Sequence, residues 1–78
     1  MITGGAGSEI AAMKKERIDT FVTGEGPHWS YPLAEELEMN VLYGGHYATE
    51  TFGVKRLSQY LAEDFELSSV FIDHPTGL

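Results

Sequence analysis

The sequence contains no cysteine, so neither a disulfide bond nor a thiolate metal site can stabilise the fold. Basic residues are also few: five Lys and Arg stand against twelve Asp and Glu, which gives a net charge of −7. This acidity argues against nucleic-acid phosphate or an anionic membrane surface as the main partner. Apolar runs are short as well, and none approaches the roughly 20 residues that a membrane-spanning helix needs.

The length of 78 residues predicts a single domain over residues 1–78. A domain this small buries only about 60% of the surface that its unfolded chain exposes, so its core is marginal. Self-association, a bound metal or additional polypeptide would relieve that shortage. The first ten residues carry neither a basic region nor an apolar signal core, so the expected location is the cytoplasm.

Short apolar runs alternate with segments of helical periodicity. The predicted strands are Met1–Thr3, Ile18–Val22, Asn40–Tyr43 and Ser69–Asp73, and the predicted helices run from an N-cap at Ser8 to Arg17, from about residue 30, and over residues 49–63. Strands with nearly continuous apolar character are typical of sheets covered by helices on both faces. The sequence therefore predicts an α/β fold: a short, mostly parallel sheet with flanking helices, built from successive βαβ units.

A polar, glycine-containing motif follows each predicted strand. In chain order these motifs are TGGAGS, TGEGPHW, GGHYATE and DHPTGL, and they contain all three histidines, His28, His46 and His74. Ligands bind outside the carboxyl ends of the strands in open parallel sheets. The four motifs are therefore expected to meet at one edge of the sheet and to form the candidate site there.

His46 and Glu50 are the candidate metal ligands. Their spacing of four residues places the two side chains on one side of a helix, or across the mouth between a loop and a helix. Imidazole and carboxylate together suit divalent zinc, manganese, iron or cobalt. The alternative is an exposed histidine and a first-turn glutamate that complements the helix dipole. Spacing alone favours this alternative, since zinc usually takes three or four ligands from protein.

Two further residues, Glu25 and His28, follow the second predicted strand. They could orient a metal ligand or contact substrate, and the alternative is an ordinary polar loop. The TGGAGS turn resembles a phosphate-binding loop, but it lacks both the complete G-x-G-x-x-G pattern and the Walker lysine. A tight strand-to-helix turn is therefore the preferred interpretation of that motif.

Three groups of residues together resemble the Nif-three-like family, whose members are also labelled GTP cyclohydrolase type 2 homologues. They are Thr23-Gly24-Glu25, the run GHYATE at 45–50 with Gly53-Val54, and DHPTG at 73–77. The resemblance covers nearly the whole chain and implies an α/β protein with a dinuclear metal centre, assembled as a toroidal hexamer. It also implies that His46 and Glu50 bind metal and that Glu25 and His28 lie beside the centre.

The chain departs from that family in one respect. Family members are longer, and their N-terminal part supplies further metal ligands that include a pair of adjacent histidines, whereas no His-His pair occurs here. The chain therefore resembles the C-terminal half of the family fold and holds part of the site. We expect a homo-oligomer, or a partner chain that supplies the missing ligands.

Two functions follow from these expectations. The first is a metal-dependent hydrolase, or part of one, that acts on a phosphate-bearing or nucleotide-like small molecule, and it rests on the family analogy. The second is a non-catalytic assembly or binding module with an incomplete metal site, which the small size and the missing ligands favour.

Overall fold

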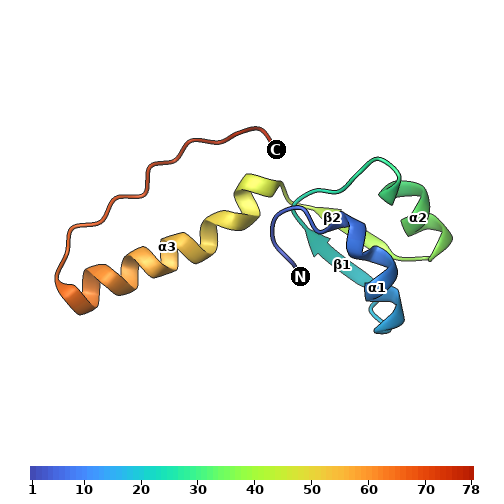
Figure 1. Cartoon of the computed structure of the whole chain (residues 1–78), viewed down its shortest axis with the longest axis horizontal. Coiled ribbons are helices and arrows are strands. Elements are labelled where there is room, and N and C mark those ends of the chain that lie inside the picture. The colour runs from blue at the N-terminus through green and yellow to red at the C-terminus, as the bar shows by residue number, and fades with distance from the viewer.

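The computed structural model describes all 78 residues of the chain. Its elements in order are the 3-10 turn η1 (Gly7–Glu9), α1 (Ile10–Lys15), β1 (Thr20–Thr23), α2 (Ser30–Glu36), β2 (Asn40–Tyr43) and α3 (His46–Phe65). After α3 the chain reverses, and residues 67–78 run back beside the helix without forming a helix or strand (Figure 1). The molecule is elongated, with extents of 51 × 26 × 13 Å.

The sheet consists of β1 and β2, which are parallel and are connected through α2. Phe21 lies opposite Val41, and Thr23 lies opposite Tyr43. Because side chains alternate between the faces of a strand, these four residues point to the same face of the sheet. The predicted α/β fold with parallel strands is confirmed, and the observed bounds of β2 coincide with the predicted ones.

A small core forms on that face of the sheet. Ile10, Phe21 and Met39 are buried, and residues of α1, of α2 and of the position directly after α2 pack around them: Met13, Leu33, Ala34 and Leu37. The opposite face is open, and the side chain of Leu42 there is 52% exposed. The expectation that helices cover both faces is therefore wrong for this chain, because both short helices pack on one face and α3 extends away from the sheet (Figure 1).

The N-terminal predictions need correction. Met1–Thr3 is not a strand, since it makes one backbone hydrogen bond to the sheet, from Ile2 N–H to the Val22 carbonyl (3.0 Å). Ser8 is not an N-cap: it lies inside η1, and its hydroxyl donates to the carboxylate of Glu9 (3.3 Å). The helix ends two residues before the predicted end because Arg17 adopts a left-handed φ of 60°.

Helix α3 is longer than predicted, and it begins at His46 rather than at residue 49. Gly45, with φ of 93°, turns the chain into the helix, and Glu66 ends it in the left-handed region. The predicted apolar stripe is present, but its residues Val54, Leu57 and Leu61 are exposed rather than buried. Neither α3 nor any other helix combines the length and apolar character needed to cross a membrane.

The last predicted strand, Ser69–Asp73, does not form. The segment is extended, but it has no neighbouring strand with which to pair. A strand depends on a partner for its backbone hydrogen bonds, so local sequence preference for extended backbone is not sufficient to form one.

Candidate metal site

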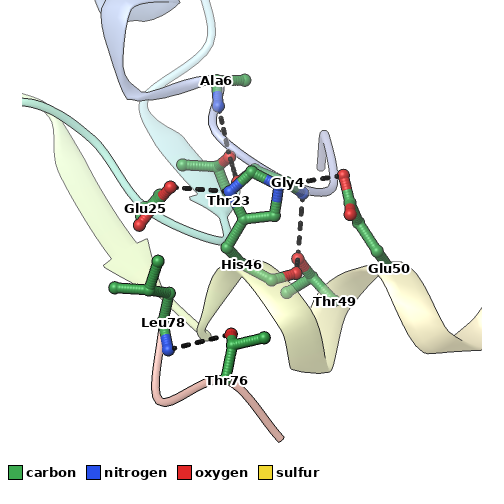
Figure 2. A network of polar contacts seen from close by, with 9 residues as sticks. All are labelled: Gly4, Ala6, Thr23, Glu25, His46, Thr49, Glu50, Thr76 and Leu78. Atoms are coloured by element: carbon green, nitrogen blue, oxygen red, sulfur yellow. Dashed lines mark hydrogen bonds and ion pairs between the residues drawn. The ribbon is translucent and has the colours of Figure 1, made fainter. Parts of the chain in front are cut away.

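The glycine motifs meet beyond the carboxyl ends of β1 and β2, as Figure 2 shows. The Gly4 amide donates to the buried Thr49 hydroxyl (2.9 Å), and the Gly4 carbonyl accepts from the Glu25 amide (3.0 Å). The amide of Tyr47, in the first turn of α3, donates to the carbonyl of Leu78 (3.2 Å). Three loops that are far apart in the sequence are thereby fixed around the first turn of α3.

Two glycines permit this close approach. A Cβ at Gly24 would overlap the Gly4 carbonyl oxygen and would lie 2.8 Å from the Cα of His46. Gly4 has φ of 72°, and a Cβ there would overlap a carboxylate oxygen of Glu50. The TGGAGS turn therefore passes directly against the candidate ligands, which explains its glycine content without a bound phosphate.

His46 lies between two carboxylates, one on each ring nitrogen. Its Nδ1 is 2.6 Å from Glu25 Oε1, and its Nε2 is 3.2 Å from Glu50 Oε1 (Figure 2). An ionised carboxylate can only accept a hydrogen bond, so Nδ1 carries the proton shared with Glu25. All three side chains are partly exposed, and solvent ions can therefore reach the pair formed by His46 and Glu50.

This environment raises the pKa of His46 above its ordinary value of 6.5. The hydrogen bond to Glu25 is the largest cause. Partial burial opposes the rise, and the negative charges of Glu50 and Glu25 add to it. The imidazole is therefore held in a position that favours a positive charge at Nε2, whether a proton or a metal ion supplies that charge.

The donor pair fits part of a metal site. When His46 is neutral, the bond to Glu25 keeps the proton on Nδ1, so the Nε2 lone pair faces the Glu50 carboxylate at 3.2 Å. Metal–ligand bonds of about 2.0–2.2 Å place two donors of one ion about 3 Å apart. The separation and the chemistry of these two atoms therefore suit a shared divalent ion.

The chain does not assemble a complete ligand set. No group of three or more His, Cys, Asp or Glu side chains is arranged to hold a metal ion. Glu25 cannot serve as the third ligand, since it occupies the opposite ring nitrogen of His46. Any further ligands would have to come from water or from additional polypeptide.

The other polar candidates lie outside this arrangement. The side chain of His28 is exposed and makes neither a hydrogen bond nor an ion pair. Asp73 accepts a hydrogen bond from the Tyr47 hydroxyl (2.9 Å), and the backbone amide of His74 donates to that same hydroxyl (2.8 Å). Both residues therefore attach the last segment to α3 rather than line the candidate site.

Two threonines that the sequence analysis did not select are buried beside the site. The hydroxyl of Thr23 donates to the Gly4 carbonyl (3.3 Å), and the hydroxyl of Thr49 accepts from the Gly4 amide. They are the threonines of the TGE and ATE motifs, and that was the available signal, since small hydroxyl residues beside glycine turns often bond to backbone.

Comparison with known proteins identifies the family of the chain. A sequence model of the family described as Duf34/NIF3 (NGG1p interacting factor 3) matches residues 1–77. The chain belongs to this family. The resemblance expected from the TGE and GHYATE motifs is thereby confirmed.

Relatives of the Duf34/NIF3 chain are considerably longer. The GTP cyclohydrolase 1 type 2 homolog of Pyrococcus horikoshii is 46% identical over 78 residues, and the protein of that name from Chlamydia muridarum is 47% identical over 75. These matches cover 100% and 94% of this chain but 31% and 29% of the relatives. The chain therefore spans about a third of their length.

Two solved structures share the fold. One is described as protein ybgI of unknown function, and it is 36% identical with a TM-score of 0.89. The match covers 95% of this chain and 30% of the ybgI chain. The other is TTHA1606 from Thermus thermophilus, which is 46% identical with a TM-score of 0.83. The match covers 100% of this chain and 31% of the TTHA1606 chain.

Proposed function

We propose that this chain is the part of a metal-dependent hydrolase that supplies two metal ligands, His46 Nε2 and Glu50 Oε1. The observation that carries the proposal is the gap of 3.2 Å between a ring nitrogen and a carboxylate oxygen. With the Nδ1 proton held by Glu25, that gap is stable only when a proton or a cation lies between the two atoms. Zinc, manganese, iron and cobalt all suit such a donor pair.

The residues around the ligands would have distinct tasks. A bound divalent ion would lower the pKa of a coordinated water and so provide a nucleophile for hydrolysis. Glu25 fixes the tautomer and the orientation of the His46 ring, as carboxylates behind metal-binding histidines do. Thr49 and Gly4 hold the first turn of α3 in position. A phosphate-bearing or nucleotide-like substrate is proposed from the relatives' name, GTP cyclohydrolase 1 type 2 homolog.

A non-catalytic binding or assembly module is the second candidate. Its support is the absence of a third ligand and the exposed apolar face of α3. Such a module would retain the fold and would bind metal weakly or not at all.

Zinc titration by calorimetry, at matched pH and protein concentration, separates the two candidates. We expect the wild-type chain to bind zinc, and we expect His46→Ala and Glu50→Ala each to weaken binding about tenfold or more. His28→Ala is the matched control, because it removes an exposed histidine whose side chain makes no hydrogen bond or ion pair, and it should leave the affinity unchanged.

The same titration on a full-length relative, such as the Pyrococcus horikoshii protein, should show tighter zinc binding than this chain. Equal affinity would mean that the chain holds ligands other than those proposed. A zinc affinity that neither His46→Ala nor Glu50→Ala lowers would refute the proposed site.

A further inference from the structure

The backbone of Gly4 lies directly against the two candidate metal ligands. A Cβ built on Gly4 would overlap Oε1 of Glu50 and would lie 3.4 Å from Nε2 of His46. These are the two atoms whose separation of 3.2 Å defines the candidate site. Gly4 has φ of 72°, in the left-handed region that glycine adopts without strain. The position of the Gly4 backbone therefore limits where the Glu50 carboxylate can lie.

Two buried threonines hold the polar groups of the Gly4 backbone. The Gly4 amide donates to the Thr49 hydroxyl (2.9 Å), and the Thr23 hydroxyl donates to the Gly4 carbonyl (3.3 Å). Both threonine side chains are buried, so the loss of either hydroxyl would leave a buried polar group without a partner. Thr23 ends β1 and Thr49 lies in the first turn of α3. Gly4 therefore connects the sheet to the helix that carries both candidate ligands.

The hydrogen bonds of Gly4 also reach His46 by two routes. On one side, the Thr49 hydroxyl that accepts from Gly4 donates to the His46 carbonyl (3.1 Å). On the other side, the Glu25 amide donates to the Gly4 carbonyl (3.0 Å), and the Glu25 carboxylate accepts from Nδ1 of His46 (2.6 Å). Figure 2 shows these four residues around the His46 ring. The ring and the backbone of His46 are each linked to Gly4 through one residue, an arrangement that fixes a ligand in place.

Thr51, two residues further along α3, shows what the contact with Gly4 adds. Its hydroxyl donates to the carbonyl three residues earlier, that of Ala48 (3.0 Å), just as the Thr49 hydroxyl donates to the carbonyl of His46. Thr51 is only partly buried, and its hydroxyl accepts no hydrogen bond from another loop. The two threonines therefore share the local bond to the helix and differ in the link to Gly4.

We propose that Thr23 and Thr49 are positioning residues for the candidate metal site: they fix the Gly4 backbone, and Gly4 in turn keeps the Glu50 carboxylate beside Nε2 of His46. Each threonine hydroxyl already donates one hydrogen bond and accepts another, so both act through Gly4 and not on the ion itself. The effect on metal affinity rests on the proposed function, whereas the effect on the position of Glu50 does not. Replacing residues that orient metal ligands typically weakens metal binding about 10- to 100-fold.

A methyl group at Gly4 tests the contact with Glu50 in the full 78-residue chain. Gly4→Ala would displace the Glu50 carboxylate, because the new Cβ overlaps its Oε1, and zinc affinity measured by calorimetry should fall about tenfold or more. Gly77→Ala is the matched control. Gly77 has φ of 84°, so both substitutions place alanine in the left-handed region, but a Cβ at Gly77 would meet no atom within 4 Å. Zinc affinity should be unchanged in that control.

Substitutions of the threonines test the hydrogen bonds, on variants that circular dichroism shows to be folded. Thr49→Val removes the hydroxyl and should weaken zinc binding about tenfold or more, whereas Thr49→Ser keeps the hydroxyl and should bind zinc nearly as the wild type does. Thr51→Val is the matched control and should leave the affinity unchanged. Thr23→Val should weaken binding as well, and the double variant should be no weaker than Thr49→Val, because both threonines act through Gly4. If the valine variants do not fold, the comparison of Gly4→Ala with Gly77→Ala decides.

Metal-free crystal structures separate this proposal from the proposed function. We expect the gap between His46 Nε2 and Glu50 Oε1 to stay near 3.2 Å in the wild type and in Gly77→Ala, and to exceed about 4 Å, the limit of an ion pair, in Gly4→Ala. A widened gap, found together with a wild-type chain that binds no zinc, would contradict the metal site and support the positioning role. An unchanged gap in Gly4→Ala would overturn the positioning role, and so would equal losses of zinc affinity in Thr49→Val and Thr51→Val.

Discussion

Residues 1–49 bury apolar side chains among themselves, whereas residues 50–78 leave theirs exposed. All nine buried residues belong to the first region, including the core of Ile10, Phe21 and Met39. The second region contains no buried residue at all. The first region therefore carries the packing that the fold needs, and the second region presents an exposed apolar surface.

The candidate metal site lies where the two regions join. His46 and Thr49 belong to the first turn of α3, which loops of the first region hold, while Glu50 borders a hollow that Val54, Phe71 and Ile72 of the second region line. One side of the site is therefore fixed by the chain's own contacts, and the other side is open. This difference explains how the chain can position two candidate ligands without assembling a complete ligand set.

The comparison is tested most strongly by removing one large apolar side chain from each region. Phe21→Ala creates a cavity in the core, and we expect a loss of about 3–5 kcal/mol of unfolding free energy. Leu57→Ala removes a side chain that is already exposed, and it should change stability by about 0.5 kcal/mol or less. Urea denaturation followed by circular dichroism measures both, and equal losses would show that α3 is packed in the free chain.

A methyl group added at Gly24 tests the junction between the loops. Gly24→Ala would push the Gly4 turn away from His46, and we expect a loss of about 1–3 kcal/mol. Zinc affinity should fall as well, because the first turn of α3 would lose its support. Wild-type stability and wild-type zinc affinity in this variant would contradict the close approach of the three loops.

The two carboxylates around His46 should have unequal effects on its pKa, which NMR titration of the ring protons measures. The pKa of His46 should lie above 6.5 in the wild type, and Glu25→Ala should lower it more than Glu50→Ala does. The raised pKa stabilises the folded chain below about pH 6.5, and this contribution is lost as the pH rises through the folded-state value.

Zinc binding should show the opposite pH dependence. It should strengthen as the pH rises through the pKa of His46, since the metal displaces the Nε2 proton.

The NMR titration has its own contradicting outcome. If Glu50→Ala lowered the pKa of His46 more than Glu25→Ala does, Glu25 would not be the larger cause of the raised pKa.

The smallest effect is expected at Gly53, in the middle of α3. A Cβ there would meet no atom within 4 Å, and alanine is the better helix former, so Gly53→Ala should stabilise the chain by about 0.5–1 kcal/mol. Thermal unfolding measures this gain. A loss of stability on Gly53→Ala would contradict the open space around Gly53. Gly24→Ala is the contrasting substitution, because a Cβ at Gly24 would overlap neighbouring atoms.

Local sequence signals predicted the elements that depend on neighbouring residues. The apolar run Asn40–Tyr43 formed a strand at its predicted bounds, and the four-residue spacing of His46 and Glu50 placed both side chains on one side of a helix. The predicted convergence of polar motifs is confirmed in part: Glu25 and His46, which follow the parallel strands β1 and β2, come together, whereas His28 and His74 lie outside the site.

Features that depend on distant residues were not predictable in this way. Ser69–Asp73 has the composition of a strand but no partner, and the bond between Glu25 and His46 joins residues 21 positions apart. The roles of Gly4 and Gly24 likewise depend on how closely separate loops approach, which spacing along the chain does not reveal.

Residue-by-residue hydrogen exchange on the isolated chain tests the central contrast most directly. The account predicts slow exchange for the amides that pair β1 with β2 and for Gly4, together with exchange at nearly unprotected rates from Leu67 to Asp73. Equal protection of the two regions in a monomeric chain would contradict it, because the last segment would then be packed in the free chain.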